Sequence, residues 1–154
     1  MPTTQLEGLR IGWDSIGDGP AVVVFNGIGA DRSSAALKAA WLAAEGFCAI
    51  TLDNPGVGQS ERPGTRCSIG VMADVAAALL DSLGVGQAHF LGHSMGGAIS
   101  QEIGSADLIS SPRSSCTAHG VGRIRIWRRC SSRGVASSRR SGPYPSGRTC
   151  FSGR

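Results

Sequence analysis

The stretch of sequence that decides the fold reads Gly92-His93-Ser94-Met95-Gly96. The apolar run before it, at residues 89–91, predicts a buried strand, and residues 98–103 predict a helix after it. A G-x-S-x-G pattern in this context indicates a sharp strand-to-helix turn with the serine at its tip. Gly92 and Gly96 lack the Cβ atoms that would collide as the strand and the helix close together. We therefore expect the Ser94 hydroxyl to stand clear of the sheet edge.

Upstream of this turn, short apolar runs alternate with helical patterns. Further strands are expected at residues 8–16, 21–25 and 48–52. The first has the alternating pattern of a half-exposed antiparallel strand, whereas the other two are continuous apolar runs, typical of strands buried on both faces. The fold class is therefore α/β, with a mostly parallel sheet and helices on both faces, truncated after the helix that follows Ser94.

Two helices are expected between these strands. The first is capped by Ser33 or Ser34 and ends at Gly46, and the second is capped by Ser68 and ends at Gly84. One face of the first helix carries Leu37, Trp41 and Ala44. A Ser or Thr cap followed by an apolar periodic run and a closing glycine is a normal helix signature, so both helices fit between the expected strands.

The charges divide the chain into two segments. Residues 1–107 carry 5 Lys+Arg and 11 Asp+Glu, a net of −6, whereas residues 108–154 carry 10 Arg and no acid, a net of +10. In the second segment 7 of 47 residues are Leu, Ile, Val or Phe, which is below the roughly 20% at which a highly charged chain is expected to remain disordered. We therefore expect one α/β domain over residues 1–107 and a disordered or irregular Arg/Ser-rich tail over residues 108–154.

Two more motifs precede the Ser94 turn. Phe25-Asn26-Gly27-Ile28-Gly29 follows one expected strand, and Asp53-Asn54-Pro55-Gly56-Val57-Gly58-Gln59-Ser60 follows the next. Together with Gly92–Gly97, and in this order, they resemble the oxyanion loop, the Asp-x-x-Gly-x-Gly-x-Ser loop and the nucleophile elbow of the α/β-hydrolase superfamily. The resemblance covers residues 5–103.

This resemblance implies that Ser94 is a nucleophile that attacks a carbonyl carbon to form an acyl-enzyme. It also implies an oxyanion hole made by the backbone N–H groups of Met95 and Ile28. Asn26 replaces the usual histidine of the loop, in which Gly27 and Gly29 are the supporting glycines. His93 is expected to pack beneath the nucleophile, and Asp53 to be structural.

The acid and the histidine of a catalytic triad follow the serine in this family, in that order. After Ser94 the sequence contains only Glu102 and Asp107 as acids and only His119 as histidine. Asp107 and His119 are the candidate triad partners, although they are too close in sequence for the strands and helices that normally separate these groups. The composition of the chain changes abruptly at about Gly104, and our hypothesis is that the gene has lost its reading frame there. Two observations suggest it: the tail contains no acid, and the whole chain contains 14 Arg but only 1 Lys.

The resemblance implies a small acyl substrate, such as an ester or lactone, and no cofactor. The cysteines are widely spaced, so no metal site is expected. The chain has no apolar run of the roughly 18 residues that a membrane span requires, and its start does not resemble a secretory signal. We therefore expect a cytoplasmic protein. The pattern leaves its oligomeric state open.

A second interpretation treats the chain as a non-catalytic, hydrolase-derived fragment with a basic tail. Ten arginines interspersed with Trp127, Tyr144 and Phe151 could bind a polyanion by charge and stacking. A solvated tail without any partner has the same composition, so we expect no specific nucleic-acid partner.

Overall fold

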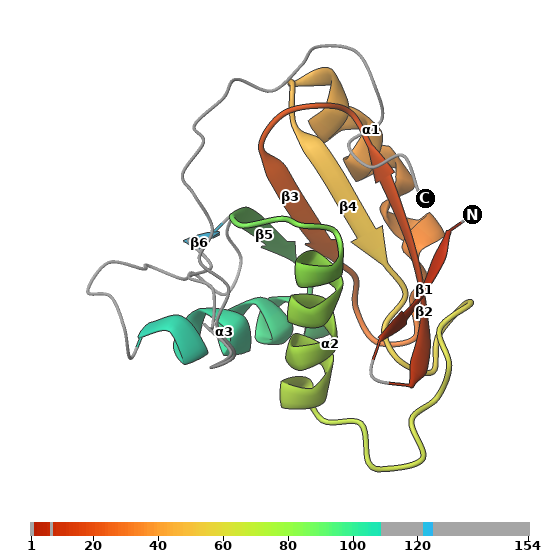
Figure 1. The fold of residues 1–154 in the computed structure, drawn as a ribbon. Helices are drawn as coiled ribbons and strands as arrows, with labels where there is room; N and C mark the ends of the chain where they lie inside the picture. The colour runs from red at the N-terminus through yellow and green to blue at the C-terminus, as the bar shows by residue number, and fades with distance from the viewer. Residues whose placement is uncertain (1, 7, 109–121, 125–154) are drawn as a thin grey trace.

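The computed structural model describes residues 2–6, 8–108 and 122–124. Within them, a mixed sheet has the strand order β1-β2-β4-β3-β5-β6. The strands are β1 (Thr3–Leu6), β2 (Leu9–Ile16), β3 (Ala21–Phe25), β4 (Cys48–Leu52), β5 (Ala88–Gly92) and β6 (Gly122–Ile124). The helices are η1 (Arg32–Ala35), α1 (Ala36–Ala44), α2 (Ile69–Ser82) and α3 (Met95–Leu108). This is the α/β class that the sequence predicts (Figure 1).

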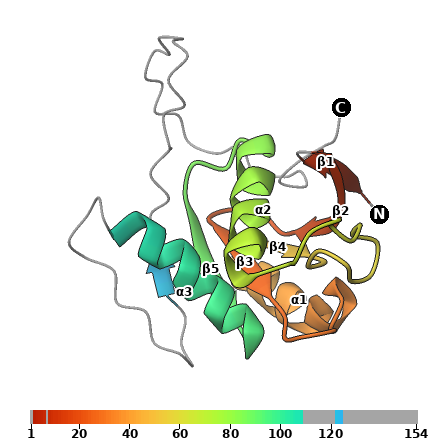
Figure 2. The same cartoon turned by 90° about the horizontal axis from the view of Figure 1, so that it is seen from below.

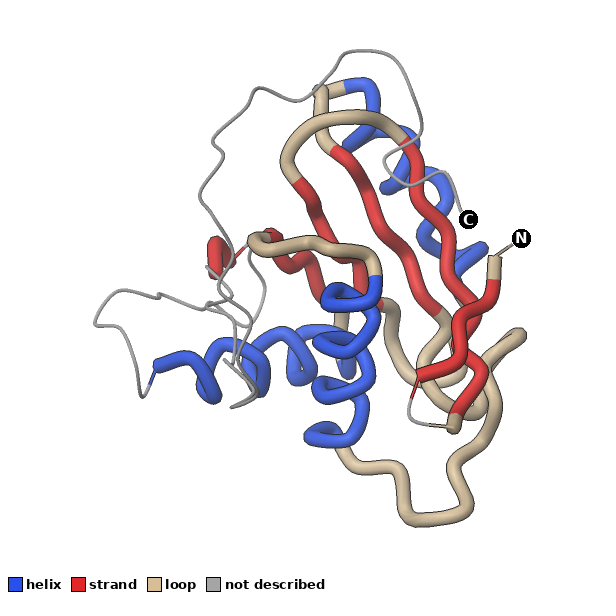
Figure 3. Tube along the Cα trace, in the orientation of Figure 1, coloured by secondary structure: helices blue, strands red, loops and turns tan. Residues whose placement is uncertain are grey.

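The centre of the sheet consists of three parallel strands. β3 pairs with β4 on one side and with β5 on the other, with Val23 opposite Ile50 and Phe90. β2 joins the edge of β4 in the antiparallel sense that the alternating pattern predicts. Because parallel strands end at the same edge, the loops after β3, β4 and β5 lie close together there. The three sequence motifs are in these loops, and Figure 3 shows the long loop of residues 53–68 that follows β4.

The two faces of the sheet are covered unequally. α2 and α3 cover one face, over a large apolar cluster that includes Phe25, Ile50, Phe90, Leu79 and Ile99. α1 lies on the other side of the sheet from α2 (Figure 2). Its cluster is small and consists of Val22, Val24, Ala35, Ala39, Leu42 and Ala49. Most of the apolar burial in the described residues is therefore on the α2 and α3 side.

The structure confirms most of the expected element ends and corrects others. The Ser68 side chain caps α2 by accepting a hydrogen bond from the Val71 N–H, as expected. The first helical segment is capped by Asp31 rather than by Ser33 or Ser34, because the Asp31 carboxylate accepts from the Ser33 N–H. Asp31 is two residues before Ser33, and its carboxylate accepts a hydrogen bond from an N–H group at the helix start that would otherwise lack an acceptor.

Further differences concern the two edges of the sheet. β1 is not predicted by the sequence pattern, and it pairs with β2 as an antiparallel edge strand. β6 pairs antiparallel with β5, although no partner strand was expected for the segment around Ile124. The arginine-rich sequence around β6 does not have the pattern of a strand. The strand forms nevertheless, because pairing with the β5 backbone does not depend on the side-chain pattern. The remaining residues of the expected tail, 109–121 and 125–154, lie outside the described residues. Among the described residues, none of the helices is both long enough and apolar enough to span a membrane.

Candidate active site

Ser94 occupies a strained position between β5 and α3. Its φ is 55°, in the left-handed region, where a residue with a side chain pays about 1–3 kcal/mol. The neighbouring glycines make the turn possible. A Cβ on Gly92 would overlap the Gly96 carbonyl, and a Cβ on Gly96 would overlap the Phe25 carbonyl at the end of β3. The Ser94 side chain is exposed as a result of this geometry.

The turn is tied to the end of β3 by backbone hydrogen bonds. The His93 N–H donates to the Phe25 carbonyl at 3.1 Å, and the Gly96 N–H donates to the His93 carbonyl at 2.9 Å. α3 begins at Met95, so the Met95 N–H belongs to the first turn of the helix. The N–H groups of such a turn have no acceptor within their own helix, and the helix dipole favours negative charge beside them.

The loop of residues 26–31 lies against this turn. A Cβ built on Gly27 would be 3.6 Å from Ser94 Cβ and 3.8 Å from His93 Cδ2, so Gly27 faces the elbow across the space of about one side-chain carbon. Gly29 has a φ of 72°, and Ile28 is 83% exposed. The structure thus brings the Asn26–Gly29 motif and the Ser94 motif to one surface.

Two residues of this surface were singled out in the sequence. His93 differs from the expectation, whereas Asn26 has an identifiable structural role. His93 is exposed rather than packed beneath the serine, because its side chain lies beside Gly27 at the open edge of the sheet. Asn26 is buried and donates from Nδ2 to the Asp31 carbonyl at 2.8 Å. This bond closes the base of the loop that carries Gly27 and Ile28.

The Asp53 loop is held by a buried ion pair. Asp53 is 1% exposed and pairs with the Arg32 guanidinium, and it also accepts hydrogen bonds from the backbone N–H groups of Arg32 and Gln59. Gly58, with a φ of 55°, leaves room for this carboxylate, since a Cβ there would overlap it. Asp53 is thus a structural residue, which agrees with its expected role.

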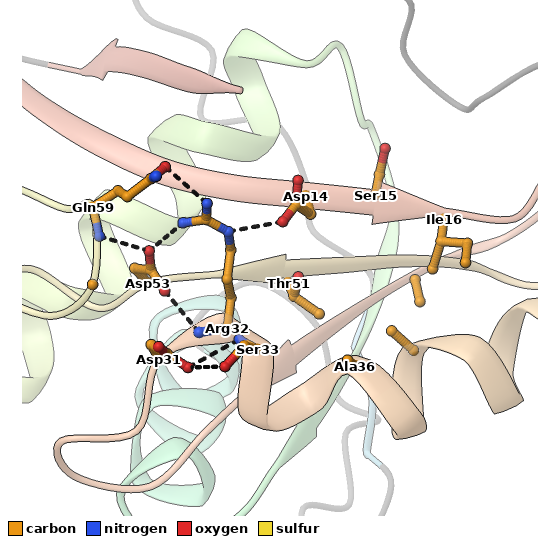
Figure 4. A pocket seen from close by; sticks show the side chains of 13 residues that line it. Asp14, Ser15, Ile16, Asp31, Arg32, Ser33, Ala36, Thr51, Asp53 and Gln59 are labelled. Atoms are coloured by element: carbon orange, nitrogen blue, oxygen red, sulfur yellow. Dashed lines mark hydrogen bonds and ion pairs between the residues drawn. The ribbon is translucent and has the colours of Figure 1, made fainter. Parts of the chain in front are cut away.

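Arg32 is a residue that the sequence analysis missed. Its guanidinium lies between three partners in Figure 4: Asp53, Asp14 on β2 at 2.8 Å, and the Gln59 side chain at 2.8 Å. The partners are 18 to 27 residues away along the chain. An isolated arginine beside a helix cap gives no sequence signal for such contacts.

These residues line a pocket of about 400 Å³ between β2, β4, η1 and α1. Its walls are mainly apolar and include Ala39 together with Ile16 and Ala36, which Figure 4 labels. Ser94, Met95 and Ile28 are not among the lining residues, so the pocket is separate from the elbow surface.

Of the two candidate triad partners, only Asp107 lies within the described residues, and its backbone is far from Ser94. Asp107 is in the last turn of α3, which places its backbone about 18 Å along the helix from Met95 at the usual 1.5 Å rise per residue. His119 lies outside the described residues. Glu102 is exposed midway along α3. In the part of the chain that the structure describes, no group of three His, Cys, Asp or Glu side chains could hold a metal ion.

The sequence model of the alpha/beta hydrolase fold matches residues 20–111. This match spans more than half of the chain, so the chain belongs to the alpha/beta hydrolase fold family. The matched region contains the Asn26–Gly29 loop, the Asp53 loop and the Ser94 turn.

Individual relatives have several different activities. The chain is 34% identical to the dihydrolipoyllysine-residue acetyltransferase component of an acetoin cleaving system from Pseudomonas putida. The alignment covers 117 residues, which are 70% of this chain and 31% of that protein. Its structure is similar to an epoxide hydrolase from Vigna radiata, with a TM-score of 0.65 and 26% identity over 69% of this chain and 35% of that one. It is also similar to the enol-lactonase from Burkholderia xenovorans LB400, with a TM-score of 0.62 and 28% identity over 71% of this chain and 42% of that one. The chain thus spans about a third of the length of the curated relative.

Proposed function

We propose that Ser94 is the nucleophile of a serine hydrolase that acts on a small ester or lactone. The observation that carries this proposal is the left-handed conformation of an exposed serine between β5 and α3, with Gly27 of the neighbouring loop facing it. Structural likeness to an enol-lactonase supports an acyl substrate. The epoxide hydrolase likeness favours small molecules more generally.

In the proposed reaction, Ser94 Oγ attacks the carbonyl carbon of the substrate. The bond from Oγ to the acyl carbon forms, the bond to the leaving group breaks, and the serine proton goes to water or to the leaving group. The N–H groups of Met95 and Ile28 would stabilise the oxyanion. Losing one such donor typically slows catalysis by about 10²–10³. Because these are backbone groups, their placement depends on the elbow and on the loop that Asn26 closes.

The second half of the reaction needs a base to activate water. Among the described residues, no side chain forms a hydrogen bond to the Ser94 hydroxyl, and the neighbouring His93 is exposed beside Gly27. Asp107 and His119 remain the candidate partners in the sequence, but α3 carries the Asp107 backbone away from the elbow. We therefore propose slow acylation of Ser94 and weak or no turnover by this chain. The acyl group would remain on the serine, since none of the described side chains is hydrogen-bonded to it as a general base.

Reaction with p-nitrophenyl acetate tests this proposal, because p-nitrophenolate leaves without help from an acid. We expect release of at most one nitrophenolate per chain, together with a mass increase of one acetyl group on the protein. Ser94→Ala should lose both signals, and Ser105→Ala, which alters an exposed serine on α3, should keep them. Folded protein that gains no acetyl group would contradict the proposal. Sustained turnover that depends on Ser94 would confirm that Ser94 is the nucleophile. It would also contradict the proposal that the acyl-enzyme lacks a base for its hydrolysis.

We also propose that residues 1–107 form the hydrolase-derived domain and that residues 108–154 are a segment outside it, of which only β6 joins the edge of the sheet among the described residues. The family match supports this boundary, because it ends at residue 111, close to where the charge changes sign. The hydrolase function is assigned to the first segment only.

A further inference from the structure

α1 is apolar on two opposite faces. Ala39 and Leu42 face the sheet and are buried against Val22 and Val24. On the far side, Leu37 is 88% exposed and Trp41 is 62% exposed. A helix that is apolar all round is normally buried on all sides. The outward face of α1 therefore lacks a partner among the described residues.

The outward residues form one continuous stripe, which we call the α1 stripe. It consists of Leu37, Trp41 and Ala44, at spacings of four and three residues. These are the spacings at which side chains lie next to one another on a helix surface. All three are exposed. In Figure 2, α1 lies at the margin of the molecule, on the side of the sheet away from α2.

Two opposite charges border the α1 stripe. Lys38 and Glu45 are both exposed and are seven residues apart, so they lie on the same flank of the helix, two turns from each other. If two copies of the helix pack antiparallel by their stripes, Lys38 of each copy approaches Glu45 of the other. Flanking charges of this kind set the orientation and the partner of paired helices.

Among the described residues, no segment covers the stripe. A second copy of α1, by contrast, supplies both the apolar stripe and the complementary charges.

We propose that this protein forms a two-fold symmetric dimer in which the α1 stripes of two copies pack antiparallel, with Trp41 near the axis. In a two-fold interface every contact occurs twice, so both Lys38–Glu45 pairs form together. One short helix per copy gives a small interface, in the class below about 1,200 Å² that is typical of weak association. We therefore expect a dimer that dissociates on dilution.

Sedimentation velocity of the full chain over a range of concentrations tests the dimer. The wild type should move from monomer to dimer as the concentration rises. Leu37→Glu should remain monomeric at every concentration, because it buries a charge in the stripe. Since Leu37 is exposed in the monomer, this variant should keep the far-ultraviolet circular dichroism of the wild type.

Charge reversal then tests the antiparallel arrangement. Lys38→Glu and Glu45→Lys should each raise the dissociation constant by about fivefold, since two exposed pairs turn repulsive together. The double variant should return it close to the wild-type value. Arg66→Glu, a reversal at an exposed position outside the stripe, serves as the control and should leave it unchanged. A wild type that stays monomeric, a dimer that survives Leu37→Glu, or a double variant without rescue would each overturn the proposal.

Discussion

The side-chain amide of Asn26 donates a hydrogen bond to the carbonyl oxygen of Asp31, 2.8 Å away, and so closes the loop that contacts the Ser94 elbow. Asn26 is buried at the end of β3, and the next residue, Gly27, lies against Ser94. An asparagine thus holds the loop where relatives of this family are expected to have a histidine. The position of the Ile28 N–H depends on this bond.

Removing the amide should loosen the loop. Asn26→Ala removes one of the two donors to the Asp31 carbonyl, which keeps the Ser34 N–H at 3.2 Å, so the free energy of unfolding should fall by about 0.5–1.5 kcal/mol. Acetylation of Ser94 should slow by at least about tenfold, because an oxyanion donor is displaced. Urea denaturation and intact-protein mass spectrometry measure the two effects. Acetylation at the wild-type rate in a destabilised variant would show that the bond supports the fold but not the site.

Breaking the buried ion pair should have a larger effect on stability. Asp53→Asn keeps the size of the side chain but leaves the buried Arg32 guanidinium without its main counter-charge. Removal of one partner of a buried pair typically costs about 3–5 kcal/mol. Urea denaturation measures this loss, and Asp18→Asn, at an exposed turn residue, is the control. A loss below about 1 kcal/mol would mean that Asp14 and Gln59 compensate Arg32 by themselves.

The Asp31 cap should respond to acid. The hydrogen bond from the Ser33 hydroxyl is the main cause that lowers the pKa of Asp31 in the folded state. A lowered pKa means that the cap stabilises the fold above the unfolded pKa of Asp31 and loses this effect as the pH falls through the folded value. Ser33→Ala should raise the pKa of Asp31 toward the ordinary value, as measured by an NMR titration of its carboxyl carbon. An unchanged titration curve would contradict the role of the Ser33 hydroxyl in lowering the pKa of Asp31.

The coding sequence tests the origin of the tail. If the reading frame was lost at about codon 103, one of the other two frames should encode further strands, followed by a Gly-Asp loop and a His loop. These are the elements that would carry the missing acid and base. If neither frame encodes them, the hypothesis of a lost frame fails.

The sequence predicted those parts of the fold that depend on local pattern. The Val-rich run of β3, the Ser68 cap and the glycines around Ser94 each determine their own backbone, so they were found without knowledge of their neighbours. The β1 edge strand has no strong pattern and exists because β2 offers it a free edge.

The contacts around Arg32 and the exposure of α1 could not be predicted in the same way. Arg32 meets Asp14 and Asp53 only after β2, η1 and β4 have been brought together. Leu37 and Trp41 form an apolar face that looks like a core face in the sequence, but Ala39 and Leu42 are the residues that reach the sheet. Packing decides which of the two apolar faces of α1 lies on the sheet. The face with Ala39 is the narrower one, so it lets the helix approach the strands more closely than the face with Trp41 would.

Labelling with a fluorophosphonate probe, followed by peptide mapping, tests the central claim most directly. This reagent phosphonylates a nucleophilic serine, and the adduct can be mapped because it hydrolyses far more slowly than an acyl-enzyme. We predict slow labelling of the wild type on Ser94, none in Ser94→Ala, and unchanged labelling in Ser105→Ala. Folded wild-type protein that takes up no probe, or that takes it up at another residue, would contradict the account of Ser94 as the nucleophile.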